Sequence, residues 1–65
     1  MSDEEIITKL KAGEGVGEVE ISQLYRIAKL LNADTTWAKR ARGRGFEERA
    51  LWDAISEKIE EMKKR

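Results

Sequence analysis

The chain has 65 residues, of which 40% are charged and 40% apolar, so we expect one small domain spanning residues 1–65. It has no cysteine and no histidine, which excludes zinc fingers, thiol catalysis and histidine acid–base chemistry, and we expect no metal and no cofactor. No apolar run approaches the roughly 20 residues of a membrane span, and the acidic start differs from the basic start of a signal peptide. The sequence therefore predicts a cytoplasmic protein without membrane contact.

The net charge is zero, but the charges are segregated along the sequence. Residues 1–20 carry six acids and two bases (−4), residues 21–45 carry six bases and one acid (+5), and residues 46–65 carry six acids and five bases (−1). One positive face on a neutral body is typical of a protein that follows a phosphate backbone, while the acidic remainder limits non-specific contacts. The distribution keeps nucleic acid among the expected partners.

The first predicted element is a helix that ends before Gly13. Ser2 and Glu5 have the spacing of a capping box, which marks its start. The apolar stripe that follows consists of Ile6, Ile7 and Leu10. Residues 13–20 contain three glycines and two spaced valines, and we interpret them as a loop or short extended arm. The Gly-x-Gly-x-Gly pattern there lacks the preceding strand and the following lysine of a phosphate-binding loop.

A second helix is predicted from Ser22, which can cap it, to Asn32. Its buried face has the spacing i, i+3, i+4, i+7 and consists of Leu24, Ile27, Ala28 and Leu31. The three residues from Asn32 to Asp34 predict a turn, because asparagine tolerates the left-handed conformation at a helix exit and Asp34 is a good N-cap for a following helix.

A short basic third helix is predicted over residues 35–42, and the glycines at 43 and 45 end it. Its inward positions are the small residues Ala38 and Ala41, so we expect it to lie close against the second helix. Trp37 has two possible roles, packing on the core or touching DNA, and packing is favoured because so small a domain needs its large aromatic side chains inside.

The last predicted element is a long helix that begins near Phe46. Its apolar residues are spaced to cover the other helices and are Phe46, Leu51, Ile55, Ile59 and Met62. Trp52 lies at the edge of this stripe, and a place in the core is favoured for it. Four helices and no strand pair predict an all-α fold, a small orthogonal bundle.

Residues 22–42 resemble the helix-turn-helix of bacterial and phage repressors. The matching positions are the small residue in the first helix, the leucine before the turn, the asparagine that opens it and the small apolar residues after it, namely Ala28, Leu31, Asn32, Ala33, Ala38 and Ala41. The sequence departs from the family at Ala38, where valine or isoleucine is usual, and in the tryptophan beside it.

The resemblance implies sequence-specific binding of double-stranded DNA, with the recognition helix (about 35–42) in the major groove. The side chains that would face base edges are Thr35, Thr36, Lys39 and Arg40. The side chains that would contact the DNA backbone are Ser22, Gln23, Tyr25, Arg26, Lys29, Trp37, Arg42 and Arg44. Because no apolar stripe is left outside the predicted core, we expect a monomer on a short site and no small-molecule ligand.

Other functions fit the same residues. Trp37, Trp52 and the arginine-rich turn could anchor an acidic protein partner, which makes a protein-interaction module the main alternative. An RNA binder would need aromatic side chains exposed for stacking, and only four aromatic residues are available. The carboxylates Glu47, Glu48 and Asp53 have no metal ligands or glycine-lined cleft beside them, so a salt-bridged helix surface explains them and no enzymatic activity is expected.

The sequence also resembles a computationally designed protein, either a DNA binder or a plain helical scaffold. Its capping box, its Glu- and Lys-rich helix surfaces and its lack of proline are typical of design. A phage or thermophile repressor has similar features, and in that case we expect the protein at the nucleoid.

Overall fold

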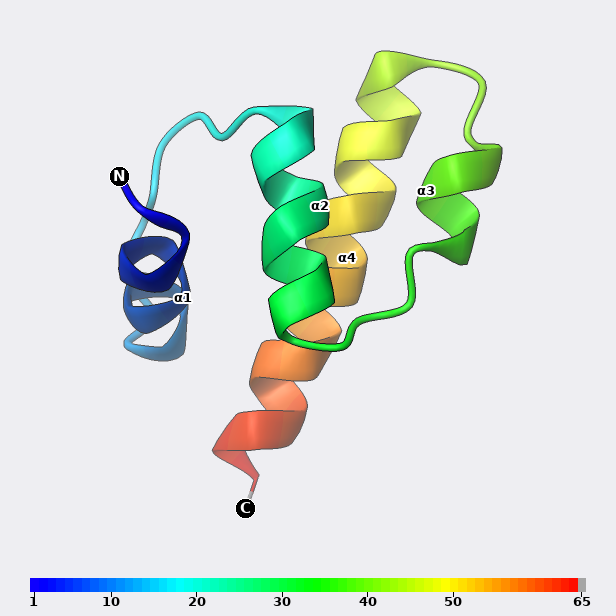
Figure 1. Ribbon diagram of the computed structural model, residues 1–65. Coiled ribbons are helices and arrows are strands. Elements are labelled where there is room, and N and C mark those ends of the chain that lie inside the picture. Colours follow the sequence, from blue (N-terminus) through cyan, green and yellow to red (C-terminus); the bar gives the residue numbers. More distant parts are fainter. Residues whose placement is uncertain (65) are drawn as a thin grey trace.

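The computed structural model describes residues 1–64, which form four helices (Figure 1). These are α1 (Asp3–Lys11), α2 (Ile21–Leu30), α3 (Thr36–Arg40) and α4 (Arg44–Lys63). No strand occurs among the described residues, so the predicted all-α class is confirmed. The longest helix, α4, lies between α2 and α3 and contacts each of the other three helices.

The core is formed by apolar side chains from all four helices and from the arm before α2. The buried residues are Ile6 of α1, Val19 of the arm before α2, Leu24, Ile27 and Ala28 of α2, Ala38 of α3, and Leu51, Ile55 and Ile59 of α4. Trp52 is half-buried and packs against this core, as expected. Burying an isoleucine or leucine side chain stabilises a fold by roughly 1.5–3 kcal/mol, so these few residues supply most of the driving force for folding.

Local signals fix the two ends of α1. The backbone N–H of Glu5 donates to Ser2 Oγ over 3.2 Å, and the Ser2 hydroxyl in turn donates to the Glu5 carboxylate over 3.3 Å. The helix stops before Gly13, whose φ of +78° favours glycine. The arm over residues 13–20 is irregular, as predicted, and Val19 (8% exposed) anchors it to the core.

The exit from α2 confirms the predicted turn at Asn32. Its φ is +58°, the left-handed conformation. The N–H of Asn32 donates to the Lys29 carbonyl over 3.1 Å, and the N–H of Ala33 donates to the Ala28 carbonyl over 2.8 Å. This pair of hydrogen bonds is a Schellman motif, which satisfies carbonyls that the helix end would otherwise leave unpaired.

The third helix differs from the prediction in length and in neighbour. It covers five residues, because Ala41 is extended (φ −63°, ψ 139°) and Arg42 lies in the connection to α4. No Cα atom of α2 lies within 8 Å of one in α3, so the expected close contact of these two helices is wrong. Because α3 has only one fully buried side chain, Ala38, it packs against the helix with the largest apolar surface, which is α4. The helix-turn-helix resemblance remains a prediction.

The fourth helix also corrects the sequence analysis. It begins at Arg44, so Gly45, which was predicted to help end the third helix, lies inside α4, and Gly43 is its N-cap. Phe46 is 75% exposed and Met62 is 40% exposed, so the prediction that both lie in the core is wrong. Both lie near the ends of α4.

The packing predicts that Ile55→Ala lowers the free energy of unfolding by about 2–5 kcal/mol, because Ile55 is fully buried in the middle of α4. Urea denaturation followed by circular dichroism measures the change. Ser56→Ala is the control, since Ser56 is the next residue and is exposed. Equal unfolding midpoints for the two variants would contradict a core centred on α4.

Candidate nucleic-acid interface

Four cationic side chains gather where α3 ends and α4 begins. Lys39 and Arg40 end α3, Arg42 lies in the connection, and Arg44 opens α4. We call these four residues the basic segment. All four are exposed, and none forms an ion pair with another residue in the described part of the chain. In Figure 1 the connection forms an outer corner of the molecule. The structure therefore keeps these predicted contact residues together and accessible.

The opposite end of α3 is acidic. Asp34 Oδ1 accepts the backbone N–H of Thr36 over 3.0 Å and its hydroxyl over 2.6 Å. These hydrogen bonds hold the pKa of Asp34 below its ordinary value. Thr35 is half-buried and follows Asp34 in the sequence, and Thr36 is hydrogen-bonded to Asp34. Both threonines predicted to read bases therefore lie beside a carboxylate that repels phosphate. Of the four predicted base contacts, Lys39 and Arg40 are the two at the basic end.

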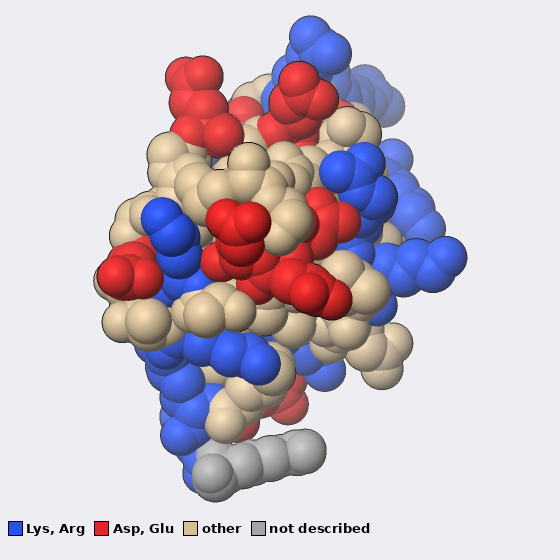
Figure 2. Space-filling model, turned by 60° about the vertical axis from the view of Figure 1, so that its left-hand side comes forward, with Lys and Arg blue, Asp and Glu red and all other residues tan. Residues whose placement is uncertain are grey.

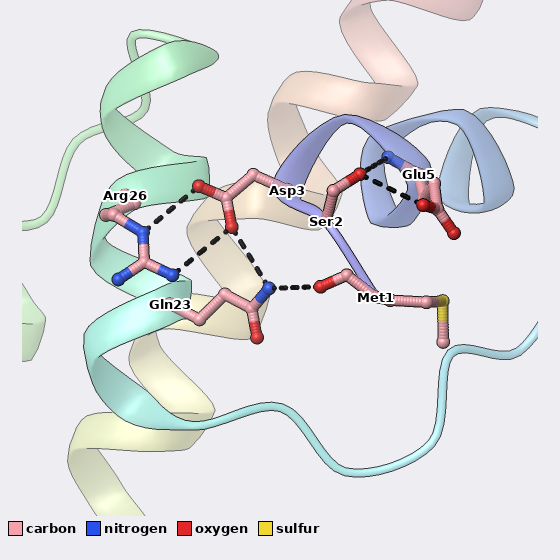
Figure 3. Close-up of polar contacts among 6 residues, drawn as sticks. All are labelled: Met1, Ser2, Asp3, Glu5, Gln23 and Arg26. Atoms are coloured by element: carbon pink, nitrogen blue, oxygen red, sulfur yellow. Dashed lines mark hydrogen bonds and ion pairs between the residues drawn. The ribbon is translucent and has the colours of Figure 1, made fainter.

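Two predicted DNA-backbone contacts on α2 are already bonded to the N-terminal residues (Figure 3). Gln23 Nε2 donates to the Met1 carbonyl and to Asp3 Oδ1, each over 3.0 Å. Arg26 Nε donates to Asp3 Oδ2 over 3.1 Å, and this contact and the Gln23 bond hold the pKa of Asp3 below its ordinary value. Because Asp3 occupies both side chains and brings a negative charge, Gln23 and Arg26 do not join the basic segment.

Of the remaining predicted contacts on α2, Ser22 and Tyr25 line the same hollow, and Lys29 lies away from it. The Tyr25 hydroxyl donates to Glu47 Oε2 over 2.7 Å and so links α2 to α4. Ser22 is exposed and lines a shallow hollow with Arg44, which places it near the basic segment. Lys29 is exposed in the last turn of α2, far along that helix from Ser22.

The sequence analysis missed an acidic groove beside Trp37. The ring is 72% exposed, so the favoured place in the core is wrong. The groove has a volume of about 520 Å³ and is lined by Asp34, Trp37, Ala50, Asp53, Ala54, Glu57, Lys58 and Glu61. Its α4 residues recur every three or four positions, which puts them on one helix face, and this spacing was the available signal. In α4 the one ion pair among described residues joins Lys58 to Glu61 at 3.2 Å, so the salt bridges expected for Glu47, Glu48 and Asp53 do not form.

Carboxylates also gather on another part of the surface. Figure 2 turns the side of α1 toward the viewer and shows a group of carboxylates at its centre, with cationic side chains to its left, below it and along the right-hand edge. Among residues 1–64, no group of three or more carboxylate side chains is placed to hold a metal ion, and no helix is long and apolar enough to cross a membrane.

Comparison with protein-family models, curated proteins and solved structures gave no match.

The Tyr25 contact gives a pH-dependent prediction. The hydrogen bond to Glu47, helped by partial burial and by the negative charge of that carboxylate, raises the pKa of Tyr25 above its ordinary value of 10.0. The protonated phenol is the form that donates this bond. Its contribution to stability is therefore complete below pH 10 and disappears as the pH rises through the raised pKa.

Tyr25 is the only tyrosine, so the ultraviolet absorbance of phenolate reports it alone. An alkaline titration should give a midpoint above 10 for the wild type and one closer to 10 for Glu47→Gln. Glu48→Gln is the matched control and should keep the wild-type midpoint. The same midpoint in both variants would show that the Tyr25–Glu47 bond does not form in solution.

Proposed function

We propose that the protein binds double-stranded DNA through the basic segment. The observation that carries the proposal is the accessibility of Lys39, Arg40, Arg42 and Arg44, four cations within six residues that form no ion pair in the described part of the chain. Phosphate contacts supply most of the non-specific affinity of DNA-binding proteins, and Arg and Lys are the side chains that make them. A free group of four is suited to that role.

The shape of α3 decides how its side chains meet the duplex. Five helical residues extend about 7.5 Å, which fits within a major groove about 12 Å wide. We assign base contacts to Lys39 and Arg40 in its last turn, because both donate to guanine O6 and N7. Arg42 and Arg44 then hold phosphates. In this arrangement the C-terminal end of the helix contacts the bases, whereas in the repressor family the N-terminal end does so.

The carboxylates on the rest of the surface restrict the approach of DNA. Asp34 lies at the start of α3, and Asp53 and Glu57 line the groove beside it. Asp3 covers the exposed side of α2 near Gln23 and Arg26. Each of these groups repels phosphate, which favours approach at the corner formed by the basic segment. Glu47 and Glu48 line the hollow beside Arg44 and limit the approach from that side.

Fluorescence anisotropy with labelled duplexes, measured over a range of salt, tests the phosphate contacts. Arg42→Gln combined with Arg44→Gln should make the negative slope of log K against log salt shallower by about two, since each phosphate contact contributes about −1 to that slope. Lys9→Gln combined with Lys11→Gln removes the same charge from α1 and should leave the slope unchanged. Equal losses in the two double variants, or no binding by the wild type, would refute the proposal.

Selection from a randomised duplex library tests base reading. We expect one short motif to be enriched, and Arg40→Ala to weaken discrimination at a single base position by about 1–3 kcal/mol. Arg44→Ala, which removes a proposed phosphate contact, should weaken binding to all sequences alike. If no motif is enriched, the basic segment binds DNA without reading sequence.

A further inference from the structure

The surroundings of Trp37 do not suit nucleic acid. The groove that it lines carries four carboxylates and one ammonium, a formal charge of −3. Lys58 is already paired with Glu61, and Asp53 and Glu57 are exposed without an ion-pair partner among the described residues. A phosphate placed on the indole ring would face these carboxylates. The ring and the groove therefore need a different occupant from the DNA assigned to the basic segment.

The chemistry of the groove selects a cation on an aliphatic stem. An exposed indole face attracts guanidinium and ammonium groups, and carboxylates around it strengthen that attraction. The lining includes the small residues Ala50 and Ala54, whose short side chains leave room for a long side chain to lie along α4. Arginine and lysine side chains have this combination of an apolar stem and a cationic head.

We propose that the groove binds the basic segment of a second copy of this chain. The segment carries four positive charges against the −3 of the groove, and it is exposed on an outer corner of the molecule (Figure 1). Within one copy the segment reaches only the near end of the groove, where Lys39 acts electrostatically on Asp34, whereas Arg44 and Glu57 are separated by 13 positions of α4, or about 20 Å. The complementary charges meet between copies.

The contact is head to tail, since the two surfaces that meet are different. Each copy presents one groove and one basic segment, so successive copies add to an open chain or close into a ring. The expectation of a monomer is then replaced by salt-sensitive self-association. DNA and the groove use the same cations, so where DNA binding holds, the duplex competes with self-association.

Sedimentation velocity of the full chain at low and high salt is the first test. We expect the average mass to rise with protein concentration at low salt and to fall to the monomer at high salt, because the screening length drops from about 30 Å to about 3 Å. A wild-type chain that stays monomeric at low salt would overturn the proposal. If that monomer bound an oligo-arginine peptide, the groove would belong to a basic segment of another protein.

Mixing two variants tests the pairing itself. The first reverses the groove with Asp53→Lys and Glu57→Lys, and the second neutralises the basic segment by changing Lys39, Arg40, Arg42 and Arg44 to Gln. All six positions are exposed, so both variants should fold, which circular dichroism checks. Each should be monomeric alone, and an equimolar mixture should form a dimer and nothing larger, because only one intact groove meets one intact segment. A monomeric mixture would overturn the proposal.

Trp37→Ala tests the part played by the ring. It should weaken the association constant by about two- to fivefold, the size of an exposed cation–π contact. Leu30→Ala is the control, because Leu30 is 62% exposed in α2 and lies outside both the groove and the basic segment. Loss of association in both variants alike would count against a specific role for Trp37. The groove takes no part in the proposed DNA contacts, so failure of self-association leaves those contacts unaffected.

Discussion

The apolar stripe of α4 is the interaction on which the rest of the structure depends. Leu51, Ile55 and Ile59 lie one turn apart and are almost completely buried. The helices α1, α2 and α3 each contact α4. In a chain of 65 residues there is one core, and a short helix is stable only against its largest apolar surface. Position relative to α4 therefore determines which charged groups end up together.

The placement of α3 on α4 separates charges of opposite sign. The start of α3 comes to lie beside the carboxylate-rich face of α4, and Trp37 is left on the wall of the resulting groove. The end of α3 is close to the start of α4, so Lys39, Arg40, Arg42 and Arg44 form one exposed corner. A neutral chain thus presents a positive surface and a negative one a few turns apart. The first suits a phosphate backbone and the second a basic side chain.

Features set by neighbours in sequence could be predicted, and features set by tertiary contacts could not. The cap at Ser2, the left-handed Asn32 and the buried Leu24, Ile27 and Ala28 of α2 follow from local chemistry, and the structure has them. The predicted cap at Ser22 does not form, because α2 begins one residue earlier, at Ile21. The neighbour of α3 depends on a competition between α2 and α4 for Ala38, which spacing does not reveal. In the site, the basic segment is contiguous in sequence and was found, whereas the Asp3 contacts with Gln23 and Arg26 join residues more than 19 positions apart.

The central proposal is that a DNA duplex contacts the basic segment, at the end of α3 and the start of α4, and leaves the starts of α2 and α3 free. A titration of the isotopically labelled protein with an unlabelled duplex, followed by the chemical shifts of backbone and side-chain amides, tests this directly. We expect the largest chemical-shift changes over residues 39–44. The side-chain amide signal of Gln23 should not shift, because that amide stays hydrogen-bonded to Met1 and Asp3. If the largest shifts instead occur at Ser22, Gln23 and Arg26, the duplex binds as in the repressor family and the basic segment is not the DNA-binding surface.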